Sequence, residues 1–245
     1  MSVERLLFDG GKMVVHRPKT LKEAVTLRHD IDNSVYLAGG TDDLRLNSAV
    51  SADVQLIDIN PLCNKEISIE GDELVIGGLV VLQDIAESEI VPEFIRDSAR
   101  FCASYEKRNA ATIGGNIALG RDDAYMIPAL VSAEANLLLE GKEGEKCVSI
   151  TEYLSMPGCK GIIKEIRIAK DRKGWARKIS HTSSSHATLI AAESNGVYAL
   201  EVSGSRMSFG TTPDLYKRME FSSDLSGSAE YKRYLASVIF SQEGR

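Results

Sequence analysis

The chain has 245 residues, a net charge of −6 and a sequence pI near 5.4. This length suffices for one large domain or for two to three small ones, each with an apolar core. Because no segment concentrates Lys and Arg, the basic surface of a nucleic-acid-binding protein is absent from the sequence, and we expect a protein or small-molecule partner.

The four cysteines, the N-terminus and the apolar runs indicate the cellular compartment. Cys63, Cys102, Cys147 and Cys159 lie far apart, and none forms the CxxC pair typical of zinc and iron–sulfur sites. Reduced thiols are therefore expected. No signal-peptide-like run opens the sequence, and no run approaches the roughly 18 residues of a membrane span. These features predict a soluble, cytoplasmic protein.

The first sixty residues read as strand, helix and strand followed by a glycine turn. A strand is expected at 13–18, and Thr20 can cap a helix over 21–30, with Glu23 at the capping-box position. The apolar run 35–38 then leads into two glycines. This order is typical of a βαβ-type opening.

The middle of the chain predicts mostly antiparallel strands with helices between them. A buried strand is expected at 54–59 and a hairpin at 66–78. Helices are expected from Leu82 and after Pro92, and a further helix at 124–135. Two more strands, 135–140 and 147–150, follow it.

The last third predicts a three-stranded antiparallel sheet with helices. The strands are expected at 162–170, 174–180 and 196–204, after a boundary within 156–161 that is rich in Pro and Gly. A helix is expected at 184–194. The tail 228–240 is also helical in pattern, and its predicted apolar face consists of Tyr231, Tyr234, Leu235 and Val238.

The stretch YLAGGTDDLRL places Gly39 and Gly40 between an apolar strand and a charged segment. Phosphate oxygens are held well by converging backbone N–H groups, and glycine permits the backbone conformations that this requires. Two interpretations stand. The stretch is either a strand-to-helix turn with Thr41 or Asp42 as the cap, or a phosphate-binding backbone.

A second glycine pair favours the phosphate interpretation. TIGGN, residues 112–116, repeats the order of small apolar residues, two glycines and a polar side chain. Two such loops suit the two phosphates of a dinucleotide. Neither loop fits GxGxxG or GxxxxGK[ST], so the sequence predicts a dinucleotide bound by a scaffold other than the nicotinamide Rossmann fold or the P-loop.

The segments VYLAGGTDDL, LIDIN, ELVIGGLVVLQDIA and RNAATIGGNIA, in this order and spacing, resemble the FAD-binding subunit of the molybdenum hydroxylases, which include xanthine dehydrogenase and carbon monoxide dehydrogenase. HRPKTLKEAVTL and EYKRYLASVIF extend the resemblance over nearly the whole chain. It implies an α+β, PCMH-type FAD-binding fold. Two α/β subdomains, 1–57 and 58–158, would be followed by the small C-terminal sheet domain, 159–245.

The resemblance also implies the residues that contact FAD. Ile163 would lie against the isoalloxazine ring, and Lys178 would lie near the flavin, where a cation favours an anionic reduced flavin. The pyrophosphate would lie between two walls, formed by Leu37, Ala38, Gly39, Gly40, Thr41 and Asp42 and by Ala111, Thr112, Gly114, Gly115 and Asn116.

The sequence departs from the family pattern in two places. After GGNIA the family reads N-A-S-P-x-x-D, whose Asp binds the adenosine ribose, whereas this chain has Tyr125 at that position. Asp122 or Asp123 could supply the ribose contact, or both could be exposed turn residues. The region 206–227 is also shorter than its counterpart in the family.

Several other conspicuous residues have ordinary interpretations. Trp175 is expected in the core or at an interface. His181 and His186 lack a third ligand nearby, so no metal site is expected. The serines at 183–185 are interpreted as a turn or a helix cap.

The resemblance implies an FAD-dependent oxidoreductase subunit that relays electrons between [2Fe-2S] clusters and NAD(P) or another acceptor. Molybdopterin would lie on a large partner subunit and the clusters on a small one, within a higher-order heteromer. The flavin carries the chemistry, so no catalytic side chain is expected. Two alternatives remain: a stand-alone FAD-dependent reductase, and a degenerate flavin-fold scaffold without FAD.

Overall fold

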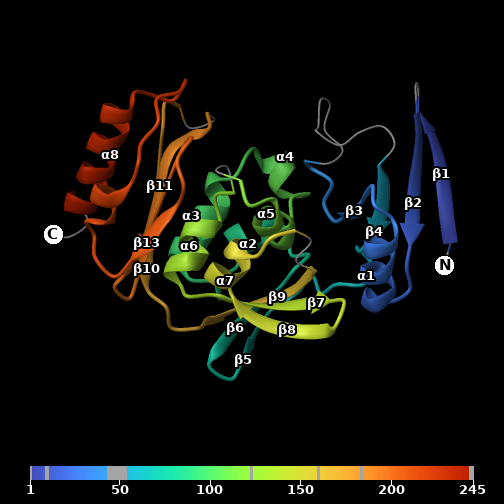
Figure 1. Cartoon of the computed structure of the whole chain (residues 1–245). Coiled ribbons are helices and arrows are strands. Elements are labelled where there is room, and N and C mark those ends of the chain that lie inside the picture. Colours follow the sequence, from blue (N-terminus) through green and yellow to red (C-terminus); the bar gives the residue numbers. More distant parts are fainter. Residues whose placement is uncertain are drawn as a thin grey trace.

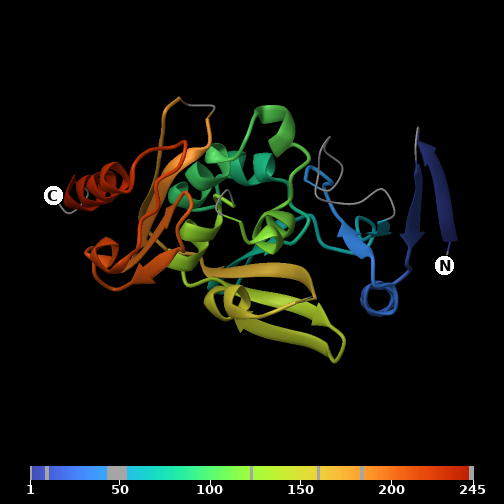
Figure 2. The same ribbon diagram turned by 45° about the horizontal axis from the view of Figure 1, so that its top comes forward.

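The computed structural model describes residues 2–8, 11–42, 54–121, 124–158, 161–182 and 185–242. Three regions follow one another along the molecule, and each is built on its own sheet (Figure 1). The β1–β2 hairpin lies at one end and helix α8 at the other in both views (Figure 2). No helix in these described ranges is long and apolar enough to cross a membrane.

The first region is a four-stranded mixed sheet in the order β1-β2-β4-β3. β4 pairs in parallel with both β2 and β3, whereas β1 and β2 are antiparallel. Thr20 caps α1 by accepting the Glu23 N–H at 3.1 Å, which confirms the predicted cap. The elements are β1 (Ser2–Phe8), β2 (Gly11–Arg17), α1 (Leu21–Asp30), β3 (Ser34–Leu37) and β4 (Gln55–Asp58).

The middle region is a five-stranded antiparallel sheet in the order β5-β6-β9-β7-β8, and six short helices belong to it. The largest apolar core lies between this sheet and the helices and continues into the third sheet. The strands are β5 (Ile67–Glu70), β6 (Glu73–Gly77), β7 (Asn136–Gly141), β8 (Gly144–Ser149) and β9 (Ile162–Ala169); the helices are α2 (Leu82–Glu87), α3 (Glu93–Phe101), α4 (Tyr105–Arg108), α5 (Ile113–Leu119), α6 (Ile127–Ser132) and α7 (Ile150–Ser155).

The third region is an antiparallel sheet in the order β10-β11-β12-β13, with a C-terminal helix packed on it. Trp175 is partly buried and packs against the core of this region, with its ring centroid 6.0 Å from that of Phe240; the sequence predicts a position in the core or at an interface. The elements are β10 (Gly174–Ser180), β11 (Ala187–Ser194), β12 (Val197–Val202), β13 (Ser208–Gly210), the 3-10 helix η1 (Leu215–Arg218) and α8 (Ala229–Gln242).

The α+β class is confirmed, but two predicted elements of the last third are wrong in detail. The strand at 162–170 is β9, which pairs with β6 and β7 in the middle sheet instead of the third. The segment 184–194, predicted as a helix, contains strand β11. Alternate residues of β11 face two cores, with Ile190 in the first and Leu189 in the second. A strand covered on both faces has a continuous apolar run, which periodicity cannot distinguish from a buried helix.

The apolar face predicted for α8 is wrong for both tyrosines. Tyr231 and Tyr234 are 44% and 64% exposed, while Lys232 is fully buried. The Lys232 ammonium lies 2.7 Å from the Asp224 carboxylate and donates to two backbone carbonyls, which offsets the cost of burying its charge. A sequence pattern assigns lysine to the surface, so the true face, Lys232, Ala236, Ile239 and Phe240, was missed.

Candidate functional site

The first glycine pair follows strand β3 at the carboxyl end of a parallel pair. Gly40 has a φ of +65°, which favours glycine. Gly39 packs directly on another segment, because a Cβ there would lie 1.9 Å from the carbonyl oxygen of Ala110. Only glycine fits at position 39, because the backbone there touches the backbone of the second glycine segment.

The backbone of the first glycine segment, residues 37–42, has N–H groups that donate to no other described residue. Among the described residues, the N–H groups of Gly39, Gly40 and Thr41 donate to no protein acceptor. Unpaired backbone donors are stable only where water or a ligand reaches them. The first glycine segment therefore has the donors of an anion-binding backbone.

The second glycine pair lies in the first turn of helix α5 and not in a loop. Thr112 caps this helix, and its hydroxyl accepts the Gly115 N–H at 3.2 Å. Gly114 donates to the Gly78 carbonyl and Asn116 to the Thr112 carbonyl. Of the N–H groups from 111 to 116, only that of Thr112 has no protein acceptor in the described ranges. The second glycine pair therefore forms part of the site's wall, but its own N–H groups already have protein acceptors.

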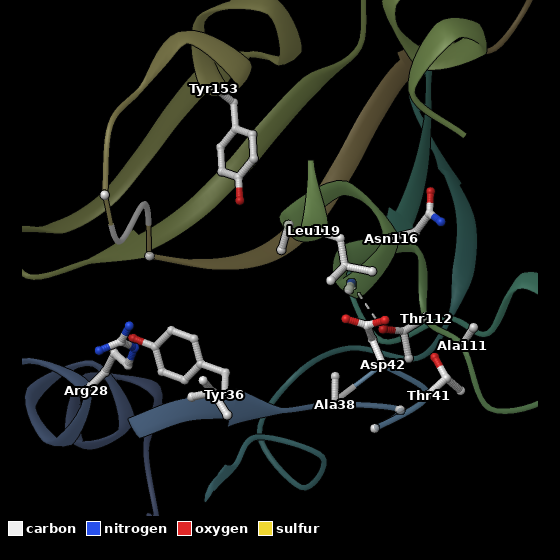
Figure 3. A pocket seen from close by; sticks show the side chains of 17 residues that line it. Arg28, Tyr36, Ala38, Thr41, Asp42, Ala111, Thr112, Asn116, Leu119 and Tyr153 are labelled. Carbon is white, nitrogen blue, oxygen red and sulfur yellow. Dashed lines mark hydrogen bonds between the residues drawn. The ribbon is translucent and has the colours of Figure 1, made fainter. Parts of the chain in front are cut away.

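Both glycine segments line a cavity of about 320 Å³ (Figure 3). Arg28 and Tyr36 of the first region face Leu119 and Tyr153 of the middle region across this space in the close-up. Of the predicted contact residues, the cavity is lined by Ala38, Gly39, Gly40, Thr41, Asp42, Ala111, Thr112, Gly115 and Asn116.

A second cavity of about 440 Å³ adjoins the first. The two share the lining residues Thr41, Asp42, Ala111, Asn116 and Leu119, whereas Gly39 and Gly40 line only the first. An elongated ligand with a central anionic group matches two adjoining cavities whose shared lining is flanked by N–H donors that have no acceptor among the described residues.

Charged groups lie at this junction and in the second cavity. Arg121 Nη1 lies 2.9 Å from Asp42 Oδ1, and the pair joins the first segment to the chain just after α5. The Lys178 ammonium lies 5.2 Å from the centroid of the Tyr125 ring, and burial lowers the pKa of Lys178. Arg121 and Lys178 therefore place two cations in the wall of the second cavity, which Asp42 also lines.

Tyr125 lines the second cavity and joins the middle region to the third sheet. Its hydroxyl accepts the Ala187 N–H at 3.0 Å and lies 3.3 Å from the His186 ring nitrogen Nδ1. His181, the other histidine of this run, bonds to the Ser226 carbonyl. No cluster of three or more metal-ligating side chains occurs in the part of the chain that the structure describes.

Of the remaining predicted contact residues that the structure describes, one lines a cavity and the others do not. Lys178 lines the second cavity. Leu37 ends β3 beside the first segment, and Gly114 packs against Gly78 behind the second. Ile163 is buried in β9 within the core and lines neither cavity. Asp122 lies outside the described residues.

Sequence reasoning missed several residues that build the site. Arg28, Tyr36 and Tyr153 line the first cavity and Arg121 the second, but none of them was among the predicted contact residues. Asn60 holds the first segment from behind through its side-chain amide. The only signal for Asn60 was its place in LIDIN, directly after a strand that pairs with β3.

Comparison with known proteins agrees with this geometry. Residues 9–170 match the family described as the FAD binding domain in molybdopterin dehydrogenase. The chain is 26% identical over 251 residues to the uncharacterized protein YgfM of Escherichia coli (strain K12), covering 91% of this chain and 92% of that one. It is 31% identical over 174 residues to the carbon monoxide dehydrogenase medium chain of Hydrogenophaga pseudoflava, covering 66% and 61%.

A solved structure shares the fold. A chain of the carbon monoxide dehydrogenase from Hydrogenophaga pseudoflava that lacks the Mo-pyranopterin moiety of its molybdenum cofactor superposes with a TM-score of 0.79 at 24% identity. The match covers 93% of this chain and 94% of that chain. The whole three-region arrangement is therefore common to both.

Proposed function

Because this chain belongs to the family of FAD-binding domains in molybdopterin dehydrogenases, we propose that it binds FAD in the two connected cavities and is the flavin subunit of a molybdenum hydroxylase. The observation that carries the proposal is the set of N–H groups of Gly39, Gly40 and Thr41, which have no acceptor among the described residues and lie in or beside the lining that the two cavities share. A dinucleotide has its negative charge in the middle, where these donors lie.

The residues present fit FAD. The N–H groups of Gly39, Gly40 and Thr41 would hold the pyrophosphate, and the Thr112 N–H is a further donor on the opposite wall. A side chain at Gly40 would be strained by its positive φ. Arg121 offsets the charge of Asp42, which would otherwise repel the phosphates.

Bound FAD would supply the redox chemistry, because flavins accept and release electrons singly or in pairs. The chain's own residues bind and orient it. Lys178 is one of the cations that line the second cavity, and its ammonium is kept in place by the Tyr125 ring and the Phe101 carbonyl. A cation held against a flavin stabilises negative charge on it, so Lys178 would raise the reduction potential.

The proposal includes partner subunits. The relative from Hydrogenophaga pseudoflava is a medium chain, a name that implies a larger and a smaller companion. We therefore assign molybdopterin to a large partner and [2Fe-2S] clusters to a small one. FAD would relay electrons between the clusters and NAD(P) or another acceptor.

A scaffold without FAD is the second candidate, favoured by Tyr125. In the family pattern this position carries an acid that contacts the ribose, but here the hydroxyl is bound to Ala187 and His186. An FAD ligand would lose that contact. The loss weakens binding but leaves the pyrophosphate donors in place, so we favour the flavoprotein.

Flavin content tests the two candidates directly. The chain is purified without added flavin, denatured, and the released FAD is quantified by its absorbance after chromatography; apo protein is then titrated with FAD. About one FAD per chain, or saturable binding of added FAD, supports the proposal. Absence of both supports the scaffold. Copurification of a molybdenum-containing and an iron–sulfur subunit tests the assembly separately.

A further inference from the structure

Asn60 lies behind the first glycine segment and contacts it twice. Its side-chain Nδ2 donates to the Ala38 carbonyl at 3.0 Å and to the Leu37 carbonyl at 3.3 Å. Asn60 lies just after β4, next to β3, and lines neither cavity. The amide therefore hydrogen-bonds to the segment from outside both cavities, away from the proposed ligand.

The position of the carbonyls determines the direction of the next N–H groups. In a trans peptide the C=O of one residue and the N–H of the next point in opposite directions, and the described peptide bonds contain no cis form. With the Ala38 carbonyl turned toward Asn60, the Gly39 N–H points away from Asn60. Gly39 itself lines the first cavity, whereas Asn60 does not.

Asp58 determines which end of the Asn60 amide faces the segment. Asp58 Oδ1 accepts both the backbone N–H and the Nδ2 of Asn60, each at 3.0 Å. An amide turned by 180° would place its oxygen against Asp58 and against the two carbonyls, which is repulsive. The carboxylate thus keeps the donor end toward Leu37 and Ala38.

We propose that Asn60, oriented by Asp58, is the positioning residue of the dinucleotide site: it fixes the peptide between Ala38 and Gly39 so that the Gly39 N–H faces the pyrophosphate. This inference rests on the proposed function. It also accounts for the unpaired donors of the first segment, since a flexible loop would rotate them toward protein acceptors or solvent. The ligand class is a flavin or adenine compound that carries a diphosphate.

The test replaces the donor with an acceptor of the same size. Asn60→Asp places a carboxylate against the two carbonyls, and Asn60→Ala removes the contact. We expect both variants of the full chain to raise the Kd for FAD and for ADP by about tenfold to a hundredfold, the range of one or two hydrogen bonds to a charged group. Riboflavin, which has no phosphate, should bind as it does to the wild type.

Asn64→Ala is the matched control. Asn64 lies on the same connection, and its side-chain oxygen accepts the Glu66 N–H at 2.9 Å, away from the glycine segment. Its removal should leave the Kd for all three ligands within about twofold of the wild type. A parallel loss of FAD, ADP and riboflavin binding in the Asn60 variants would indicate general disruption and would reject the positioning role.

A measurement on the wild type keeps the test decisive if a variant does not fold. Hydrogen–deuterium exchange of the peptide spanning 38–42 should slow when ADP or FAD is bound, because the N–H groups then have acceptors. Unchanged exchange in the presence of bound ligand overturns the inference. If the wild type binds FAD and the Asn60 variants bind it equally well, only the role of Asn60 fails; if the wild type binds no FAD, the proposed function fails with it.

Discussion

In the part of the chain that the structure describes, the N–H groups of Gly39 and Gly40 after strand β3 have no acceptor, whereas those of Gly114 and Gly115 donate to the Gly78 carbonyl and to the Thr112 hydroxyl. The two pairs look alike in sequence. One lies in an open turn, and the other begins a helix.

The pairs do share one physical requirement. Gly39 packs on the Ala110 carbonyl, and Gly114 packs on Gly78, where an added Cβ would lie 2.6 Å from the carbonyl oxygen. In each pair, then, the first glycine allows two backbones to touch. The comparison teaches that a double glycine signals close approach of a backbone, and that the hydrogen-bond partners decide whether a ligand can use it.

The largest expected effect is on stability at the contact between the two segments. Gly39→Ala should lower the free energy of unfolding by about 3 kcal/mol or more, because neither backbone can yield to a Cβ at 1.9 Å. Chemical denaturation measures it. Gly210→Ala, at a site with open space, is the control and should change stability by less than about 0.5 kcal/mol. Equal stability of the two variants would show that the contact is absent.

The second prediction separates the two pairs by FAD affinity. Gly40→Ala forces a side chain into a positive φ, at about 1 kcal/mol, and distorts the donor backbone. Gly115→Ala adds a Cβ 3.0 Å from the Thr112 hydroxyl, in a helix that alanine favours by up to about 1 kcal/mol. Titration with FAD should show the larger loss for Gly40→Ala. The reverse order would contradict the assignment of the donors to the first pair.

A smaller effect is expected for the ion pair that joins the two segments. Asp42 and Arg121 are both partly exposed, so a double-mutant cycle with Asp42→Asn and Arg121→Gln should give a coupling of about 1 kcal/mol or less. High salt should reduce it further. A coupling that is large and insensitive to salt would mean that the pair is desolvated.

The smallest effect concerns the rate at which the Cys63 thiol, which packs in the same apolar cluster as Ala38 of the first glycine segment, is alkylated. Burial raises the pKa of Cys63 to about 11, and Cys63 packs in the apolar cluster that includes Tyr36 and Ala38. A raised pKa keeps the thiol protonated at pH 8, so alkylation should be slow and should accelerate about tenfold per pH unit as the thiolate forms. Peptide mapping follows each site. Labelling of Cys63 at pH 8 as fast as that of exposed Cys147 would show that the first segment opens readily.

The predictable parts of the fold were those with local signals. Thr20 and Glu23 lie within one helical turn of each other, so the start of α1 could be predicted from a few residues. The hairpin of β5 and β6 was likewise marked by Gly71, which has a φ of +62°. Strand β11 and the buried face of α8 could not be predicted in this way, because both depend on partners elsewhere in the chain.

The candidate site likewise has parts that could be predicted from the sequence and parts that could not. The glycine segments were found from sequence because their composition is unusual, and nine of their residues line one cavity. The expected equivalence of the two loops did not hold, since Gly114 and Gly115 are in a helix. Asn60 lies 22 residues from Ala38, and its place in LIDIN did not indicate which carbonyls its amide contacts.

The sequence by itself determined the family, the α+β class and the positions where backbones come close, because these depend on residue type and short spacing. Only the tertiary structure decided which N–H groups remain available to a ligand. The direction of a peptide group is set by the acceptor that its neighbouring carbonyl or N–H finds, and here those acceptors and donors come from distant strands: Asn60 for the first segment and Gly78 for the second.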